Sequence, residues 1–269
     1  MGLLYRARYD TKGIPASNAR TFSHGWYTRP GWMVDGKVRS WDDRRGDSKE
    51  IRVRPIRLAS HLSMAVATYG ALCWNAWDVF ELPNKNTAEK QVAQVSKDAL
   101  RQASQIRTGS IHLTALAAVT IVSGALVAGN DAGRAFNTFP LMDEKWIPDD
   151  ILELTPWQRN LTENTATVQW NHRVLGVSTA AAALGLAGLG LGRRAAITPQ
   201  VRRGLYAAGA AATGQATLGI VTLLNYVPIS LAAAHQLGSV VVFTSGLYLV
   251  HSLRYARPTF ARSVRQLAK

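Results

Sequence analysis

Five apolar runs, each about 20 residues long, alternate with polar segments along this chain. A run of this length can cross a hydrocarbon core of about 30 Å. It must do so as a helix, because the core holds no water to satisfy open backbone groups. The runs cover residues 58–80, 110–128, 172–192, 205–224 and 229–251. We therefore predict an all-α fold, a polytopic membrane bundle with five transmembrane helices.

The net charge of +14 comes from basic residues in the N-terminal segment, in the connections and in the tail. Basic residues flanking membrane spans are expected from topology and from anionic lipid head groups. Membrane lipid is therefore the expected partner of these charges, and nucleic acid is excluded. The single cysteine, Cys73, lies inside an apolar run. A disulfide within the chain is excluded, and a cysteine-based zinc site is not expected.

Charges between the runs predict an orientation. Residues 129–171 are mainly acidic, whereas the connection 193–204 and the tail are basic, so the positive-inside rule places the acidic loop outside. On this topology the last four runs form a self-consistent four-helix bundle. The run 58–80 then starts outside, behind a basic segment, against the rule. We expect a truncated piece of a larger protein whose earlier spans carry this segment outward.

Two histidines near the outer ends of their runs are candidate metal ligands. His172 opens one run, and His235 lies about two turns into another. Polar side chains inside a membrane are costly and often functional. Two histidines at matched depth in one bundle can bind both axial positions of a heme iron. We predict a heme site at this pair; two separate hydrogen-bonded interfacial histidines are the alternative.

His61 opens the run 58–80 after small residues, much as His235 follows Ala234. It is interpreted as half of a second site whose partner histidine this chain lacks, with a chance similarity as the alternative. Arg57 lies just before His61, and Arg173 directly follows His172. An arginine at the membrane surface can pair with a heme propionate. Ordinary positive flanking gives the same pattern.

The loop between the second and third runs contains turn residues from Gly129 to Pro140. Its apolar side chains include Phe136, Phe139 and the pair Trp146-Ile147. They suggest a loop folded down onto the bundle, where it forms a lid over an outward-facing pocket. A structured loop without that role is the alternative.

Several motifs resemble those of the heme A synthase family and occur in the same order. They are GWMV at 31–34, RLASHL at 57–62, SGALVAGNDAG at 123–133, NTFP at 137–140, WIP at 146–148, ENT at 163–165, VQWNHRVLG at 168–176 and AHQLG at 234–238. The resemblance covers residues 31–255.

The resemblance implies a fold of two related four-helix halves, each with two histidines. It implies an oxidoreductase that converts the heme O methyl group to the formyl group of heme A for cytochrome c oxidase. His172 and His235, with Arg173, would hold a heme b cofactor. His61 and Arg57 would bind the substrate heme. The family's first three spans are missing here, and with them a histidine and a catalytic glutamate, so the catalytic residues are unknown.

The family also implies a heme O synthase and an electron-donating ferredoxin as partners. It implies the mitochondrial inner membrane, with a bacterial plasma membrane as the alternative; a homo-oligomer is left open. We expect a heme A synthase-like membrane oxidoreductase, inactive on heme O if the chain is complete as written. One alternative is a non-catalytic heme b protein of electron transfer or oxidase assembly. A transporter or channel is the other.

The expected segments follow from these assignments. They are a polar N-terminal segment at 1–57, the last helix of a truncated N-terminal half with an inner loop at 58–109, a C-terminal four-helix heme-binding bundle at 110–254, and a basic tail at 255–269.

Overall fold

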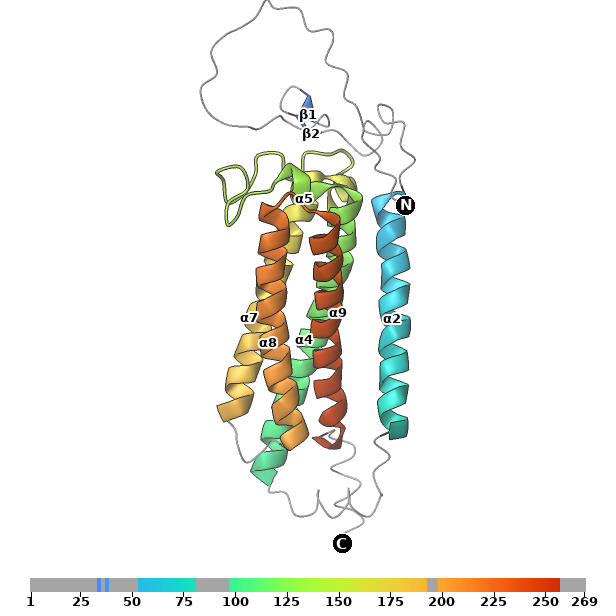
Figure 1. Cartoon of the computed structure of the whole chain (residues 1–269), viewed down its shortest axis with the longest axis vertical. Coiled ribbons are helices and arrows are strands. Elements are labelled where there is room, and N and C mark those ends of the chain that lie inside the picture. The colour runs from blue at the N-terminus through green and yellow to red at the C-terminus, as the bar shows by residue number, and fades with distance from the viewer. Residues whose placement is uncertain (1–32, 35–36, 39–52, 81–96, 193–197, 257–269) are drawn as a thin grey trace, which may run out of the picture. The chain divides into compact units, whose positions relative to one another are not determined.

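The computed structural model describes residues 33–34, 37–38, 53–80, 97–192 and 198–256, all within one compact unit that covers residues 32–269. Long helices dominate these residues (Figure 1). They are α2 (Pro55–Phe80), α4 (Lys97–Gly129), α7 (Thr165–Gly192), α8 (Pro199–Leu224) and α9 (Ile229–Ser252). The all-α fold class is confirmed. Two short strands, β1 (Met33–Val34) and β2 (Lys37–Val38), pair antiparallel within the polar N-terminal segment.

Four of the long helices, α4, α7, α8 and α9, are long and apolar enough to cross a membrane. Helix α2 has 26 residues, which is sufficient length. It does not meet the same hydropathy criterion, because polar side chains such as His61, Thr68 and Asn75 interrupt its apolar surface. Four of the five expected spans are therefore confirmed, and a spanning role for α2 stays a prediction.

Several helices begin before the apolar runs that predicted them. Helix α4 starts at Lys97 rather than at residue 110, and α7 starts at Thr165. An apolar run marks the depth of the hydrocarbon, whereas a helix continues wherever its backbone hydrogen bonds continue. The expectation that His172 opens its helix is therefore wrong, since it lies seven residues after Thr165 (172 − 165). His61 likewise lies six residues after Pro55 (61 − 55).

Helices α4, α7, α8 and α9 form a four-helix bundle. Helix α4 packs against α7 and α9, and α8 packs against the same two helices, so α7 and α9 stand at opposite corners. Glycines allow the close approach. A Cβ at Gly190 would lie 2.6 Å from Leu205 Cδ1, and one at Gly204 would lie 2.7 Å from Leu249 Cδ2. The shared core comprises Ala103, Ile106, Leu113, Ala117, Ala183, Val201, Leu205, Ala208, Ala212, Val242 and Leu249, among others.

Helix α2 lies outside this bundle, against α4 and α9 (Figure 1). The hydroxyl groups of Tyr69 and Thr244 are hydrogen-bonded at 2.8 Å and join α2 to α9. Where α2 meets α4, Gly129 of α4 leaves room for Pro55 at the start of α2. A Cβ added at Gly129 would lie 2.8 Å from the Pro55 Cα. Of the 26 residues of α2, only Pro55 and Ala59 are buried. The helix is therefore attached along one side of the bundle rather than enclosed by it.

The connection between α4 and α7 folds onto the end of the bundle (Figure 1). It contains α5 (Ala132–Ala135), η1 (Trp157–Arg159) and α6 (Asn160–Glu163). Phe136 and Met142 are buried against Ala166 near the start of α7. This packing confirms that the loop folds down onto the bundle.

The other apolar side chains expected to face the bundle are exposed instead. Phe139, Trp146 and Ile147 have exposed fractions of 38%, 71% and 56%. Backbone hydrogen bonds between Met142 and Lys145 turn the chain back just after the buried Met142. The pair Trp146-Ile147 follows this turn and points away from the core, so the prediction for these three residues was wrong.

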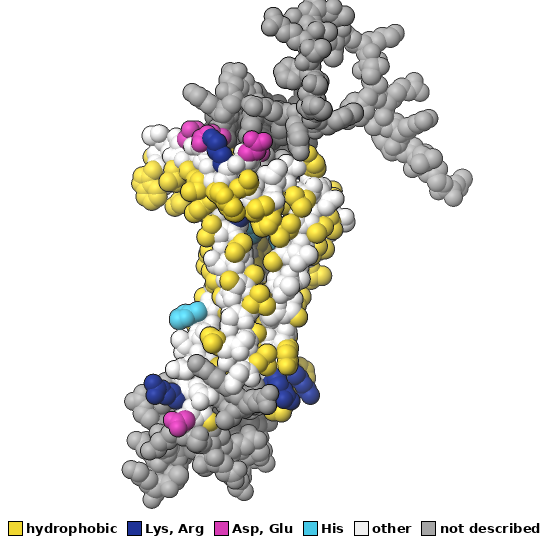
Figure 2. All heavy atoms as spheres, turned by 90° about the vertical axis from the view of Figure 1, so that its left-hand side faces the viewer, with side chains coloured by type: hydrophobic (Ala, Val, Ile, Leu, Met, Phe, Trp, Pro, Cys, Tyr) yellow, Lys and Arg dark blue, Asp and Glu magenta, His cyan; other side chains and the backbone are white. Residues whose placement is uncertain are grey.

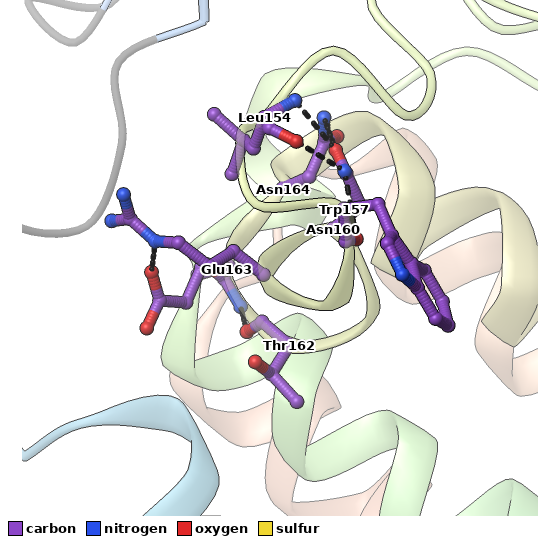
Figure 3. Close-up of polar contacts among 8 residues, drawn as sticks. Leu154, Trp157, Asn160, Thr162, Glu163 and Asn164 are labelled. Carbon is purple, nitrogen blue, oxygen red and sulfur yellow. Dashed lines mark hydrogen bonds and ion pairs between the residues drawn. The ribbon is translucent and has the colours of Figure 1, made fainter.

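Two buried asparagines hold the second part of the loop together (Figure 3). Asn160 Nδ2 donates to the carbonyls of Leu154 and Trp157 at 2.8 and 2.9 Å. Asn160 Oδ1 accepts from the Leu154 amide and from Asn164 Nδ2. Asn164 Oδ1 in turn accepts from the Thr167 amide at 2.8 Å. These bonds satisfy open backbone groups of the loop and tie it to the first turn of α7.

Figure 2 shows how the charged side chains of the described residues are distributed. Acidic side chains gather at the end of the bundle that carries the α4–α7 loop, and most basic side chains in this view lie at the opposite end. Between the two ends the surface is largely free of charge. This distribution agrees with the predicted orientation, in which the acidic loop lies outside.

Candidate functional site

The two predicted ligands meet inside the four-helix bundle. His172 lies seven residues into α7, and His235 lies six residues into α9 (235 − 229). At a rise of 1.5 Å per residue, each is about 10 Å from the outer end of its helix. The centroids of their rings are 6.5 Å apart, and the ring planes are inclined at 86°. The structure therefore brings together, at matched depth, two imidazoles from opposite corners of the bundle.

His172 is held by side chains of α4. Its Nδ1 is 2.7 Å from Ser123 Oγ, and Ser123 Oγ–H donates to the Thr120 carbonyl, also at 2.7 Å. Gly124, the next residue of α4, provides the space for the ring, because a Cβ there would lie 3.2 Å from His172 Cε1. One helical turn deeper, the hydroxyls of Thr120 and Thr179 bond at 2.8 Å and join α4 to α7. His172 thus has a defined polar partner on a fixed helix interface.

His235 is held differently, by side chains of α8. Gln215 Nε2 donates to the His235 carbonyl at 2.8 Å and lies 3.5 Å from His235 Nε2. Gly219 provides the space for the ring, since a Cβ there would lie 2.6 Å from His235 Cε1. His235 Nδ1 and Gln215 Oε1 are both buried and have no hydrogen-bond partner among the described residues. Such orphaned polar atoms are costly in an apolar interior and are typical of functional sites.

The spacing of the two imidazoles suits an iron atom bound between them. Two metal–imidazole bonds of about 2 Å, together with half the width of each ring, place linear ring centroids about 6 Å apart. The observed separation is 6.5 Å. The inclination of 86° is compatible with this arrangement, because each ring can rotate about its own metal–nitrogen bond. The donor set, two neutral imidazoles in an apolar bundle, is that of a low-spin heme.

The remaining predicted residues lie elsewhere. His61 is exposed on α2, away from the pair in the bundle, and Arg57 is exposed one turn before it. Arg173 does not point to free space, because its guanidinium bonds to the α4–α7 loop. It donates to the Phe136 carbonyl at 2.9 Å and to the Leu141 carbonyl at 3.1 Å. The guanidinium of Arg173 already holds this loop through hydrogen bonds. Binding a heme propionate would compete with those bonds.

Gln169, one turn before Arg173, reinforces the same contact. Its Nε2 donates to the Phe136 carbonyl at 3.2 Å. Two side chains of α7 therefore hold one backbone carbonyl of the loop above His172. The sequence signal for this arrangement was the polar sequence VQWNHR at the start of the helix, which was interpreted only as part of the histidine motif.

A second polar cluster lies at the opposite end of the molecule, between α2 and α9. His251 is fully buried. Its Nδ1 accepts from Arg254 at 3.0 Å, so its Nε2–H donates to Asp78 Oδ1 at 2.8 Å. Trp74 and Trp77 pack against the ring, with centroids 5.0 and 5.6 Å away. With both nitrogens bonded, His251 joins the two helices.

Comparisons with known proteins show the family to which the chain belongs. The family model described as cytochrome oxidase assembly protein, COX15-CtaA, matches residues 31–247. The chain belongs to this family. Both candidate ligands lie within the matched region. With its apolar helices, the chain is a multi-pass membrane protein.

Curated relatives share most of the chain. It is 39% identical to the protein named heme A synthase COX15 of Arabidopsis thaliana, over 98% of this chain and 54% of that protein. It is 39% identical to human heme A synthase COX15, over 83% of this chain and 51% of that protein. It is 38% identical to heme A synthase of Paracoccus denitrificans, over 85% and 57%. The chain thus spans about half the length of these relatives. No solved structure matches it significantly.

Proposed function

We propose that this chain is the heme-carrying part of a heme A synthase-type membrane oxidoreductase, with His172 and His235 as axial ligands of a heme b. The observation that carries the proposal is the pair of imidazoles 6.5 Å apart on the inside of the bundle, near its outer end. Both histidines lie in the region that the family model covers. The relatives' name, heme A synthase, supports heme A as the product. Heme O, as the substrate, is proposed from the family resemblance.

The ligand set defines what such a heme can do. Two histidine ligands leave no open position on the iron, which suits a heme that transfers electrons or stabilises the fold. The methyl oxidation of heme O would then take place outside this bundle. His61 and Arg57 on α2 are the residues of this chain that we assign to that second site. Their exposure on a helix attached only along one side is compatible with such a role.

Partners are proposed from the same relationships. One relative, from Schizosaccharomyces pombe, is named a heme A synthase-mitochondrial ferredoxin fusion protein and is 31% identical over 91% of this chain. This fusion supports a ferredoxin as the electron donor. A heme O synthase would supply the substrate. Eukaryotic relatives favour the mitochondrial inner membrane, and bacterial relatives leave a plasma membrane as the alternative.

An absorption spectrum of the detergent-purified chain, expressed with heme supplied, tests the heme site. We expect a low-spin bis-histidine spectrum in the oxidised and reduced protein. His172→Ala and His235→Ala should each abolish it. His112→Ala is the matched control, since that histidine is exposed on α4, and it should retain the spectrum. A heme-free wild-type protein, or heme retained in both ligand variants, would contradict the proposal.

The non-catalytic alternative, a heme b protein of electron transfer or oxidase assembly, requires a separate test. The matching part of the Arabidopsis relative can be replaced by this chain and expressed in a strain without its own heme A synthase. Formation of heme A supports the oxidoreductase. A chimera that binds low-spin heme but makes no heme A favours the alternative.

A further inference from the structure

Ser123 is a buried polar residue in the apolar span of α4, with an exposed fraction of 8%. A serine at such a position usually bonds only to the carbonyl one turn back in its own helix. Ser110 and Ser245 do this, at 2.8 Å each. Ser123 bonds in addition to a ring nitrogen of another helix. It therefore has a partner outside its own helix, whereas these two serines have none among the residues that the structure describes.

Counting protons fixes the direction of that second bond. A serine hydroxyl has one proton, and Ser123 donates it to the Thr120 carbonyl at 2.7 Å. Ser123 Oγ can then only accept at its 2.7 Å contact with His172 Nδ1. The proton in that contact must belong to the imidazole. In a neutral ring the lone pair is then on Nε2.

The same hydrogen bond is found at metal-bound histidines, on the ring nitrogen that does not bind the metal. Such a histidine donates the N–H of its free ring nitrogen to an acceptor, which fixes the ring orientation and raises the basicity of the ligating nitrogen. The other ligand lacks this contact, because His235 Nδ1 is buried without a partner among the described residues. The two candidate ligands are therefore unequal before any iron is bound.

We propose that Ser123 is a positioning residue that holds His172 as the Nδ1–H tautomer and presents its Nε2 to the heme iron. The inference rests on the proposed heme site. It makes His172 the stronger electron donor of the two axial ligands. Loss of the acceptor lowers the basicity of His172, which destabilises the ferric iron relative to the ferrous iron and raises the midpoint potential of the heme.

The test compares the heme-loaded wild-type chain with Ser123→Ala and Ser123→Thr. Ser123→Ala should raise the midpoint potential, change the low-spin electron paramagnetic resonance signal and weaken heme binding by about 10- to 100-fold. Ser123→Thr keeps a hydroxyl and should restore the wild-type potential. Ser110→Ala removes a fully buried hydroxyl from the same helix and should leave the potential unchanged.

Thr179→Val separates positioning from helix packing. It removes the bond to Thr120 that joins α4 to α7 but touches neither Ser123 nor His172. The potential should stay at the wild-type value. A shift in Thr179→Val equal to that in Ser123→Ala, or an unchanged potential in Ser123→Ala, would overturn the assignment.

Failure of the heme site itself gives a different result. If the wild-type chain binds no heme, the proposed function fails, and ¹⁵N resonances of the histidine rings decide the role of Ser123 alone. A protonated Nδ1 at His172 that is lost in Ser123→Ala supports the positioning role. An Nε2–H tautomer in the wild-type protein refutes it.

Discussion

His172 and His235 lie at opposite corners of the bundle, and both rings pack on a glycine but differ in their hydrogen bonds. In each corner the imidazole lies over a glycine of the preceding helix, Gly124 for His172 and Gly219 for His235. The His172 ring has a hydrogen-bond partner at Nδ1, whereas the His235 ring has none there within the described part of the chain. The glycine contact is tighter for His235, at 2.6 Å against 3.2 Å for an added Cβ.

This difference shows two ways of fixing an imidazole inside a membrane bundle. A hydrogen bond orients the ring of His172 and defines which nitrogen is free. Steric contact confines the ring of His235, and the polar support that Gln215 provides goes mainly to the backbone carbonyl of His235. Polar changes should therefore affect the first corner most, and changes of volume should affect the second.

The largest expected effect comes from adding one methyl group under each ring. Gly219→Ala should displace the His235 ring, because overpacking of this kind costs about 1–3 kcal/mol. We expect heme binding to weaken by about tenfold or more. Gly124→Ala has more room and should weaken it by less. Heme titration of the two purified variants measures both, and equal losses would show that the two corners are equally tight.

The second prediction concerns the cover of the His172 corner. Arg173→Met removes hydrogen bonds from a charged donor to the loop carbonyls of Phe136 and Leu141. The free energy of opening the loop should fall by about 2 kcal/mol, because hydrogen bonds to charged groups contribute about 1.5–3 kcal/mol each. Hydrogen exchange of the amides in residues 136–142 measures this opening.

Arg134→Met is the control for that experiment, because Arg134 is an exposed arginine of the same loop. If Arg173→Met leaves exchange unchanged and weakens heme binding instead, Arg173 binds a propionate, as the sequence pattern suggested, and does not hold the loop in place. No long loop has to be held in place beside His235, because a four-residue turn from Asn225 to Pro228 joins α8 directly to α9.

A smaller effect is expected from Gln215→Leu. The substitution removes the 2.8 Å bond from Gln215 Nε2 to the His235 carbonyl, a net loss of about 1 kcal/mol. It also removes the orphaned Oε1, which offsets part of that loss. Heme binding should fall only slightly, and the midpoint potential should not move, because His235 Nδ1 keeps the same surroundings. A potential shift as large as that of Ser123→Ala would make the two corners equivalent.

Periodicity and length predicted the helices but not where they begin. The run at 172–192 predicted the apolar part of α7, yet the helix starts at Thr165 with polar residues that lie under the loop. Its first turn is fixed by Asn164, whose side chain accepts from the Thr167 amide. An asparagine N-cap is a local sequence signal, but Asn164 lies eight residues before the apolar run (172 − 164), so the run alone did not mark this start. The division of the chain into four functional segments stays a prediction.

The candidate ligands were visible in the sequence because histidines are rare and costly in apolar runs. Their supports were not. Ser123 looks in sequence like any small residue of α4, and only the packing of α4 against α7 places it beside His172. Gln215 is visible as a polar residue in an apolar run, but its target is a backbone carbonyl of another helix. The glycines under the rings have no side chain to signal their role.

The smallest expected effect tests whether charge limits the loop above His172. Burial, and then repulsion from Glu153, Asp149 and Asp143, raise the pKa of Asp150 above its ordinary value. A raised pKa in the folded loop means that protonated Asp150 stabilises the loop, fully below about pH 4, and that this stabilisation is lost as the pH rises through the raised pKa.

Asp150→Asn should therefore tighten the loop at pH 7 by a few tenths of a kcal/mol and have no effect near pH 4. Limited proteolysis of the loop at the two pH values measures the difference. Asp149→Asn is the comparison, because it relieves part of the repulsion on Asp150 but also removes the ion pair with Lys145, so the two changes should largely cancel. Slower cleavage in Asp150→Asn at pH 7 alone would identify acid repulsion as the force that opposes closure over the His172 corner. If Asp150→Asn and the wild-type protein are cleaved equally at both pH values, acid repulsion does not matter. The hydrogen bonds of Arg173 and Gln169 would then set the stability of the loop.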